Sequence, residues 1–271
     1  MKLRKTLFIL PNLFTMSSVF CGLYSIVNSF RGTAPQDFLA AALAIVFAMF
    51  FDMVDGRVAR MTRTQSDFGL QLDSLADMIS FGVAPAILVY RWGLMNLNLW
   101  GIDLGFFAAF LFVACGAGRL ARFNVLATRN RESSSGDFVG LPIPLAAGML
   151  TSLVLAHVQS GATEVQGQLS VLFVVIALSY LMVSRVRYRA FKKLKLKNPR
   201  TLAVLLALAG AATIVSMQVR PSFALVVLFS SYVVVGLAEN LFQGGRALWA
   251  HRHHAADEIE PEANQANEPQ K

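Results

Sequence analysis

The sequence is poor in charged residues and in cysteine. Only 15% of its 271 residues are Asp, Glu, Lys or Arg, while 55% are hydrophobic, and the mean hydropathy is +0.55. Soluble globular domains carry about a quarter charged residues, so the composition argues against an ordinary soluble enzyme. The two cysteines, Cys21 and Cys115, lie in apolar runs and have neither the number nor the spacing for a disulfide framework or a Cys-x-x-Cys metal site.

Long apolar runs dominate what is present. A helix needs about 18 or more mostly apolar residues to cross a hydrocarbon core of about 30 Å, and a helix satisfies its own backbone in lipid. Eight candidate runs lie at 7–30, 38–58, 70–90, 104–121, 139–158, 169–183, 201–217 and 222–242. We therefore predict an all-α, polytopic membrane helix bundle of about eight transmembrane helices. Residues 1–245 would form the membrane domain, with a six-helix core at about 5–190 and two further helices at about 200–242, and residues 246–271 a disordered cytoplasmic tail.

The basic residues predict the orientation. With the amino terminus inside, 21 of the 24 Lys and Arg residues fall on interior segments, leaving Arg31, Arg91 and Arg220 outside. Because cytoplasmic loops are enriched in Lys and Arg, both termini are expected in the cytoplasm, with the protein in the inner (cytoplasmic) membrane. Basic residues between apolar runs form no stripe on a folded surface, so no nucleic-acid partner is expected. A cleaved signal peptide is the alternative for the first run, but that run is long and Pro11-Asn12 interrupts its start.

Four carboxylates stand where a membrane helix makes them costly. Asp52 and Asp55 close the second run, and Asp73 and Asp77 open the third. Spacings of three and four residues put each pair on one helix face, and the short polar turn between the runs predicts antiparallel neighbours. The four acids can then converge at the cytoplasmic end. Such a cluster favours a hard divalent cation such as Mg²⁺ or Mn²⁺.

Small residues follow or precede these acids by one turn. Gly56, Ala59 and Gly69 leave the acidic faces without bulk, although small residues in membrane helices also serve packing. Arg60 would face a phosphate beside a metal cluster, where a guanidinium can donate two hydrogen bonds; the alternative is a topology residue on the cytoplasmic side.

Read together, these positions form the string Asp52-x-x-Asp55-Gly56-x-x-Ala59-Arg60, then eight residues, then Gly69-x-x-x-Asp73-x-x-x-Asp77. The string resembles the signature of the CDP-alcohol phosphatidyltransferase family at all eight fixed positions. Three further segments are similar to the phosphatidylserine synthase branch of that family: Pro11-Asn12-x-x-Thr15, the run Gly118 to Asn124, and Phe138-x-Gly140-Leu141-Pro142-x-Pro144.

The resemblance implies transfer of the phosphatidyl group of CDP-diacylglycerol to the hydroxyl of L-serine, with release of CMP. It also implies two divalent ions among the aspartates, with membrane lipids around the protein and a homodimer. By the same resemblance Asp52, Asp55 and Asp73 are metal ligands, and Asp77 is a ligand or the catalytic base. The nucleotide site would be lined by Gly56, Ala59, Arg60 and Gly69, with Asn12 and Thr15 as further contacts.

Serine recognition requires a cation for the carboxylate and an acceptor for the ammonium group. Arg119, Arg122 and Asn124 offer such groups at the end of the fourth run, although they can equally be topology anchors and a helix cap. The basic run Arg185 to Lys197 fits either anionic lipid headgroups or a topological stop.

Two other functions stay open on the sequence. The same core could serve a different acceptor, such as glycerol phosphate or inositol phosphate, which would need an extra basic cluster near the metals. A cation or proton transporter would also use intramembrane carboxylates, but transporters place their sites near the membrane midplane at broken helices or repeats. Here the acids lie towards one face, and the sequence shows no internal repeat.

Overall fold

The computed structural model describes residues 2–32, 34–62, 66–129, 137–162, 165, 167–184, 186–189, 225–231 and 233. Within them, five helices are long and apolar enough to span a membrane: Pro11–Arg31, Pro35–Thr62, Asp67–Leu94, Leu104–Leu126 and Ile143–Ser160. A sixth apolar helix, α7 (Gln168–Val183), has 16 residues. The expected helix at 201–217, most of the one at 222–242 and the expected tail at 246–271 lie outside the described residues.

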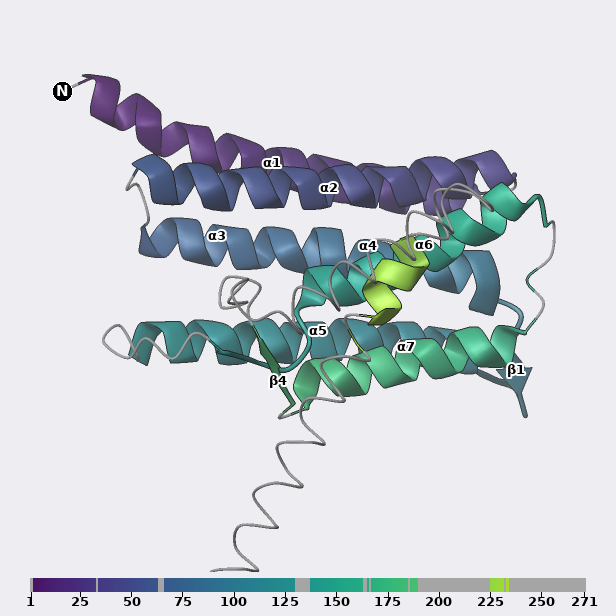
Figure 1. Ribbon diagram of the computed structural model, residues 1–271. Coiled ribbons are helices and arrows are strands. Elements are labelled where there is room, and N and C mark those ends of the chain that lie inside the picture. The colour runs from purple at the N-terminus through teal and green to yellow at the C-terminus, as the bar shows by residue number, and fades with distance from the viewer. Residues whose placement is uncertain are drawn as a thin grey trace, which may run out of the picture.

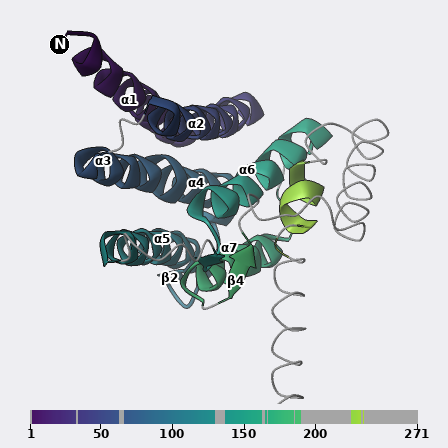
Figure 2. The same ribbon diagram turned by 60° about the vertical axis from the view of Figure 1, so that its left-hand side comes forward.

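The spans form layers. Figures 1 and 2 show α1 (Lys2–Arg31) beside α2 (Pro35–Thr62), then the third span, then α5 (Leu104–Arg129) beside α7. The third span is one continuous rod made of α3 (Asp67–Asp77), the π-helix η1 (Met78–Val83), α4 (Ala84–Val89) and the π-helix η2 (Tyr90–Leu94). The fifth span, α6 (Ile143–Ser160), runs obliquely against α2 and α4 (Figure 2). The α-helical prediction is therefore right for the spans that the structure describes.

Two short ribbons depart from the all-α prediction. β1 (Asn98–Leu99) pairs with β2 (Ile102–Asp103) around a turn in which Trp100 and Gly101 both have positive φ, the backbone typical of a tight hairpin. β3 (Asp137–Val139) pairs with β4 (Arg187–Arg189), so the fifth span begins at Ile143 and not at residue 139. The physical reason is local, because Gly140 takes a φ of +85° and Pro142 is the N-cap of α6.

Small residues let the helices of the core approach closely. On α2, Ala41, Ala42 and Ala48 are fully buried, and on α6 the same holds for Ala146 and Ala147. Close backbone approach through small side chains is typical of membrane helix packing, where burial of apolar surface from water contributes little. Many large apolar side chains are exposed on the outside of the bundle, as expected for helices surrounded by lipid.

Helix α1 packs tightly against the π-helix that follows Asp77. The Ser80 hydroxyl donates to the Ser18 carbonyl oxygen at 2.9 Å, and a Cβ atom added at Gly22 would lie 2.9 Å from the Ser80 Cα atom. Because that neighbour is backbone, even one methyl group at Gly22 would push α1 away. The contact thus holds α1 in register with the acidic end of the third span.

Candidate functional site

The acidic residues of α2 and α3 meet at one end of the bundle. Asp52, Asp55 and Asp73 each offer one carboxylate oxygen, and these three oxygens all lie within 4.8 Å of one another. The Asp77 carboxyl lies within hydrogen-bond reach of the Asp52 carboxyl. Two adjacent spans therefore bring together all four acids singled out in the sequence.

The start of α3 determines where its two aspartates point. Ser66, in an extended conformation, caps this helix: its hydroxyl accepts from the Gly69 N–H at 3.0 Å. Asp67 adds a negative charge to the first turn, which favours the helix dipole. Asp73 and Asp77 then fall one turn apart on the face turned towards α2. Gly69 belongs to this cap, because a Cβ atom there would lie 3.2 Å from the Ser66 Oγ atom.

The charges in this cluster do not balance. Among the described residues, two guanidiniums act on it, Arg60 on Asp55 and Arg119 on Asp77, against four carboxyl groups. Asp55 is only 4% exposed, so water screens it poorly. A partly buried, oxygen-only donor set with excess negative charge is what hard divalent cations bind, so the residues present fit such an ion.

Helix α2 leaves open space next to its acids. A Cβ atom added at Gly56 would meet the Arg60 guanidinium nitrogens at 3.7 and 3.8 Å, which is ordinary van der Waals contact, and no other described side chain within 4 Å. Ala59 is half-buried on the same helix, and Arg60 is exposed. The helix therefore has little side-chain bulk at Gly56, one turn after Asp52.

Helix α1 closes one side of the cluster. The Thr15 hydroxyl donates to the Asp55 Oδ2 atom at 2.9 Å, and the Thr15 side chain is 5% exposed. Asn12 lies one turn earlier on the same face of α1 and is half-buried. The sequence pattern pointed to Thr15 as a nucleotide contact, but it contained no signal for the direct bond to Asp55.

Among the described residues, Arg119 is the cation that acts electrostatically on Asp77. It is 8% exposed, it interacts electrostatically with Asp77, and its Nε atom has no hydrogen-bond partner among the described residues. Burying a guanidinium with an N–H group that has no acceptor costs free energy, unless an anion accepts a hydrogen bond from it. Arg119 is thus suited to bind a small carboxylate beside Asp77.

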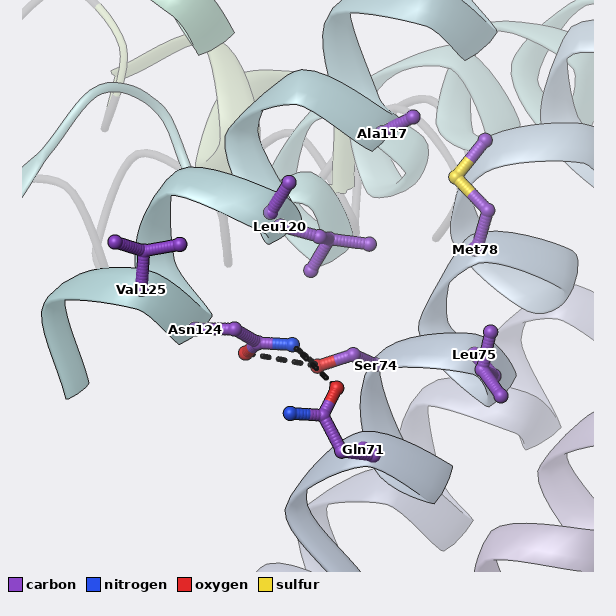
Figure 3. A pocket seen from close by; sticks show the side chains of 9 residues that line it. Gln71, Ser74, Leu75, Met78, Ala117, Leu120, Asn124 and Val125 are labelled. Atoms are coloured by element: carbon purple, nitrogen blue, oxygen red, sulfur yellow. Dashed lines mark hydrogen bonds between the residues drawn. The ribbon is translucent and has the colours of Figure 1, made fainter. Parts of the chain in front are cut away.

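The other two residues expected to read serine form hydrogen bonds with neighbouring helices. Arg122 donates from Nη1 to the Val183 carbonyl oxygen at 3.1 Å, at the end of α7. Asn124 donates to the Ser74 hydroxyl at 2.9 Å and to the Gln71 Oε1 atom at 3.3 Å (Figure 3). Gln71, Ser74 and Asn124 line a cavity of about 600 Å³ between α3 and α5. None of the four aspartates lines this cavity. Arg119 therefore acts on the acidic cluster through Asp77, while these hydrogen bonds of Arg122 and Asn124 join α5 to α7 and to α3.

The fold and the acidic cluster define an integral membrane protein with a candidate divalent-metal site at one end of its helices. Residues 8–183 match the family model for CDP-alcohol phosphatidyltransferase, and the chain belongs to this family. It is 40% identical over 240 residues to a protein of Helicobacter pylori named CDP-diacylglycerol–serine O-phosphatidyltransferase, which covers 87% of this chain and 92% of the relative.

Two more distant relatives carry related names. A protein of Bacillus subtilis with the same name is 32% identical over 189 residues, which is 70% of this chain and 94% of the relative. An archaetidylserine synthase of Methanothermobacter thermautotrophicus is 39% identical over 181 residues, which is 66% of this chain and 69% of the relative. All three names specify a seryl phospholipid as the product.

Proposed function

We propose that this chain is a CDP-diacylglycerol–serine O-phosphatidyltransferase. It transfers the phosphatidyl group of CDP-diacylglycerol to the hydroxyl of L-serine and so forms phosphatidylserine and CMP. The observation that carries the proposal is the cluster of Asp52, Asp55 and Asp73, whose ligand oxygens lie within 4.8 Å of one another, in a chain 40% identical to a protein of that name over 240 residues.

The cofactor is a pair of divalent ions, Mg²⁺ or Mn²⁺, held by Asp52, Asp55 and Asp73, with Asp77 as a further ligand or as the base. When bound, the ions neutralise pyrophosphate oxygens and align the attacking and departing groups. The support is chemical: the four acids offer only oxygen ligands, and the nearby guanidiniums of Arg60 and Arg119 leave net negative charge.

Asp77 is the proposed catalytic base. A serine hydroxyl is a weak nucleophile at neutral pH, so a carboxylate in hydrogen-bond reach must accept its proton. The serine oxygen then bonds to the phosphorus of the phosphatidyl group, while the bond from that phosphorus to the CMP oxygen breaks. Arg119 binds the serine carboxylate, which its position beside Asp77 and its unpartnered Nε atom support. Arg122 and Asn124 support this site through helix packing, because their hydrogen bonds join α5 to α7 and to α3.

The nucleotide occupies the open face of α2. Gly56 and Ala59 allow it to approach the backbone, Arg60 donates to its phosphates, and Gly69 lines the facing start of α3. Asn12 is a further contact from α1. Support comes from the space beside Gly56, where an added Cβ atom would meet only the mobile end of Arg60 among the described side chains.

Gly56→Ala separates this role from a structural one. The fold should tolerate alanine at position 56, because its Cβ atom would lie 3.7 Å from the nearest atom, the Arg60 Nη1 atom. Alanine also stabilises a helix by about 1 kcal/mol relative to glycine. We expect kcat/KM for CDP-diacylglycerol to fall about 10-fold or more, since an obstructed near-attack geometry is costly in rate. The melting temperature in detergent should be unchanged or higher.

Gly93→Ala is the matched control for this variant. It adds the same methyl group to the third span, at the end away from the aspartates, where the new Cβ atom would lie 3.5 Å from the Val165 side chain. This variant should leave kcat/KM unchanged. A Gly56→Ala enzyme with normal kcat/KM would contradict the nucleotide assignment. Equal losses in both variants would do the same.

The acceptor is tested directly with the purified protein. In mixed micelles of CDP-diacylglycerol with Mg²⁺ or Mn²⁺, labelled L-serine should enter chloroform-soluble lipid with one CMP released per serine. Glycerol 3-phosphate and inositol 1-phosphate should give little CMP, because among the described residues Arg60 and Arg119 are the cations that act on the acids. Faster CMP release with a phosphorylated acceptor would contradict the serine assignment, and no CMP release with any acceptor would contradict the enzyme class.

The proposed orientation places the acidic end of the described spans, and with it the active site, at the cytoplasmic face of the cell membrane. The protein works as a homodimer among membrane lipids. Charge supports the orientation: Arg57 and Arg60 lie at the acidic end of α2, while Arg91 donates to the Ser29 and Phe30 carbonyl oxygens at the other end of the bundle.

A further inference from the structure

Thr15 and Asp55 form a buried contact between α1 and α2. Their side chains are 5% and 4% exposed, and the Thr15 Oγ1 atom lies 2.9 Å from the Asp55 Oδ2 atom. The two residues are 40 positions apart in the chain, so the contact exists only because α1 and α2 pack along each other. Asp55 is also one of the three acids whose oxygens converge.

The Thr15 hydroxyl has two acceptors within reach and one proton to give. The Pro11 carbonyl oxygen lies at 3.1 Å, in the preceding turn of α1, and the Asp55 carboxylate lies at 2.9 Å. A hydrogen bond to an ionised acceptor is shorter and stronger than one to a neutral carbonyl, so the proton points to Asp55. The Gly56 N–H is also within hydrogen-bond reach of this carboxylate, whose two oxygens still have lone pairs for a metal ion.

We propose that Thr15 is a positioning residue that orients the Asp55 carboxylate towards Asp52 and Asp73 and thereby sets the metal affinity of the cluster. The inference rests on the proposed function, in which these acids hold divalent ions. A carboxylate that binds a metal is free to rotate about two side-chain bonds unless another group holds it, and partners of this kind typically change metal affinity 10- to 100-fold when removed. In this role Thr15 acts on the nucleotide site through Asp55 and not through its own contact.

Metal binding without substrate tests the proposal. Mn²⁺ is titrated into the purified full chain in detergent and the free ion is measured by electron paramagnetic resonance. Thr15→Val keeps the side-chain shape and removes the hydroxyl, so it should weaken Mn²⁺ binding about 10-fold. Thr15→Ser keeps the hydroxyl and should restore affinity to within about twofold of wild type, because the donor that orients Asp55 is present. Thr15→Ala replaces Thr15→Val if the valine variant does not fold.

Ser18→Ala is the matched control. It removes another buried hydroxyl from α1, one turn further on, whose partner is Ser80 and not an acid. Its Mn²⁺ affinity should equal that of the wild type. The positioning role would be overturned if Thr15→Val bound Mn²⁺ with wild-type affinity. It would also be overturned if Thr15→Ser and Ser18→Ala both weakened Mn²⁺ binding to the same extent.

Asp55→Asn distinguishes this inference from the function on which it rests. If Asp55→Asn binds Mn²⁺ weakly while Thr15→Val binds it normally, the metal site stands and the positioning role fails. If Asp55→Asn itself binds Mn²⁺ with wild-type affinity, the metal assignment of Asp55 fails and the role of Thr15 fails with it.

Discussion

Asp52→Asn is expected to reduce CMP formation from CDP-diacylglycerol and serine at least about 1,000-fold, because metal ions supply several kcal/mol of transition-state stabilisation and about 4 kcal/mol corresponds to that factor. Asp52 is the acid that joins the cluster together. Its carboxylate oxygen lies within 4.8 Å of those from Asp55 and Asp73, and its carboxyl is within hydrogen-bond reach of Asp77. Asparagine keeps the shape of the side chain but removes the charge and one of the two acceptor oxygens.

The measurement is initial-rate CMP release over a wide range of Mg²⁺ and Mn²⁺ concentrations, so that a loss of affinity and a loss of rate are seen separately. Asp67→Asn is the matched control, because it removes the same charge from an exposed position in the first turn of α3. That variant should keep its rate. If Asp52→Asn retained most of the wild-type turnover at saturating metal, the acidic cluster could not be the metal centre.

Asp77→Asn is expected to lower kcat about 10²- to 10⁴-fold, the range that a general base contributes, while leaving Mn²⁺ affinity near that of the wild type. The expectation follows from its place in the cluster. Asp77 lies within hydrogen-bond reach of Asp52 and interacts electrostatically with Arg119, whereas the three oxygens that lie mutually within 4.8 Å belong to the other acids. Asparagine cannot accept the serine proton, but it can keep the neighbouring hydrogen bonds.

The two quantities must come from one preparation, with kcat from labelled serine incorporation and affinity from Mn²⁺ titration. Asp52→Asn provides the contrast, because it should lose both. A parallel loss of kcat and Mn²⁺ affinity in Asp77→Asn would identify Asp77 as a ligand, and full turnover would exclude it from the chemistry altogether.

The local sequence pattern was sufficient to predict the helices and the arrangement of the aspartates in pairs on one helix face. Runs of apolar residues predicted the five spans and the shorter helix α7 that the structure describes, because a segment in lipid must satisfy its backbone within itself. The spacing of Asp52 with Asp55, and of Asp73 with Asp77, placed each pair on one face because helical geometry depends only on near neighbours. The start predicted for the fifth span, at Val139, was wrong, because Val139 belongs to strand β3. An apolar run does not reveal the turn at Gly140, whose φ is positive.

Serine recognition shows where the pattern was not enough. Arg119, Arg122 and Asn124 are close in the sequence and carry suitable groups, yet Arg119 acts on Asp77 while Arg122 and Asn124 form hydrogen bonds to α7 and α3. Successive positions on a helix point in different directions, and which direction meets the site depends on how α5 is rotated against α3 and α7. That rotation results from packing contacts along the whole helix.

The sequence by itself determined that this protein is helical and embedded in a membrane, and that it carries four acids in two facing pairs. These properties depend on composition and on spacing within one turn of a helix. Only the tertiary structure decided that Thr15 bonds to Asp55, 40 residues away, and that Arg119 faces Asp77. Contacts of that kind depend on the register between separate helices, which many weak packing interactions set jointly and no short stretch of sequence encodes.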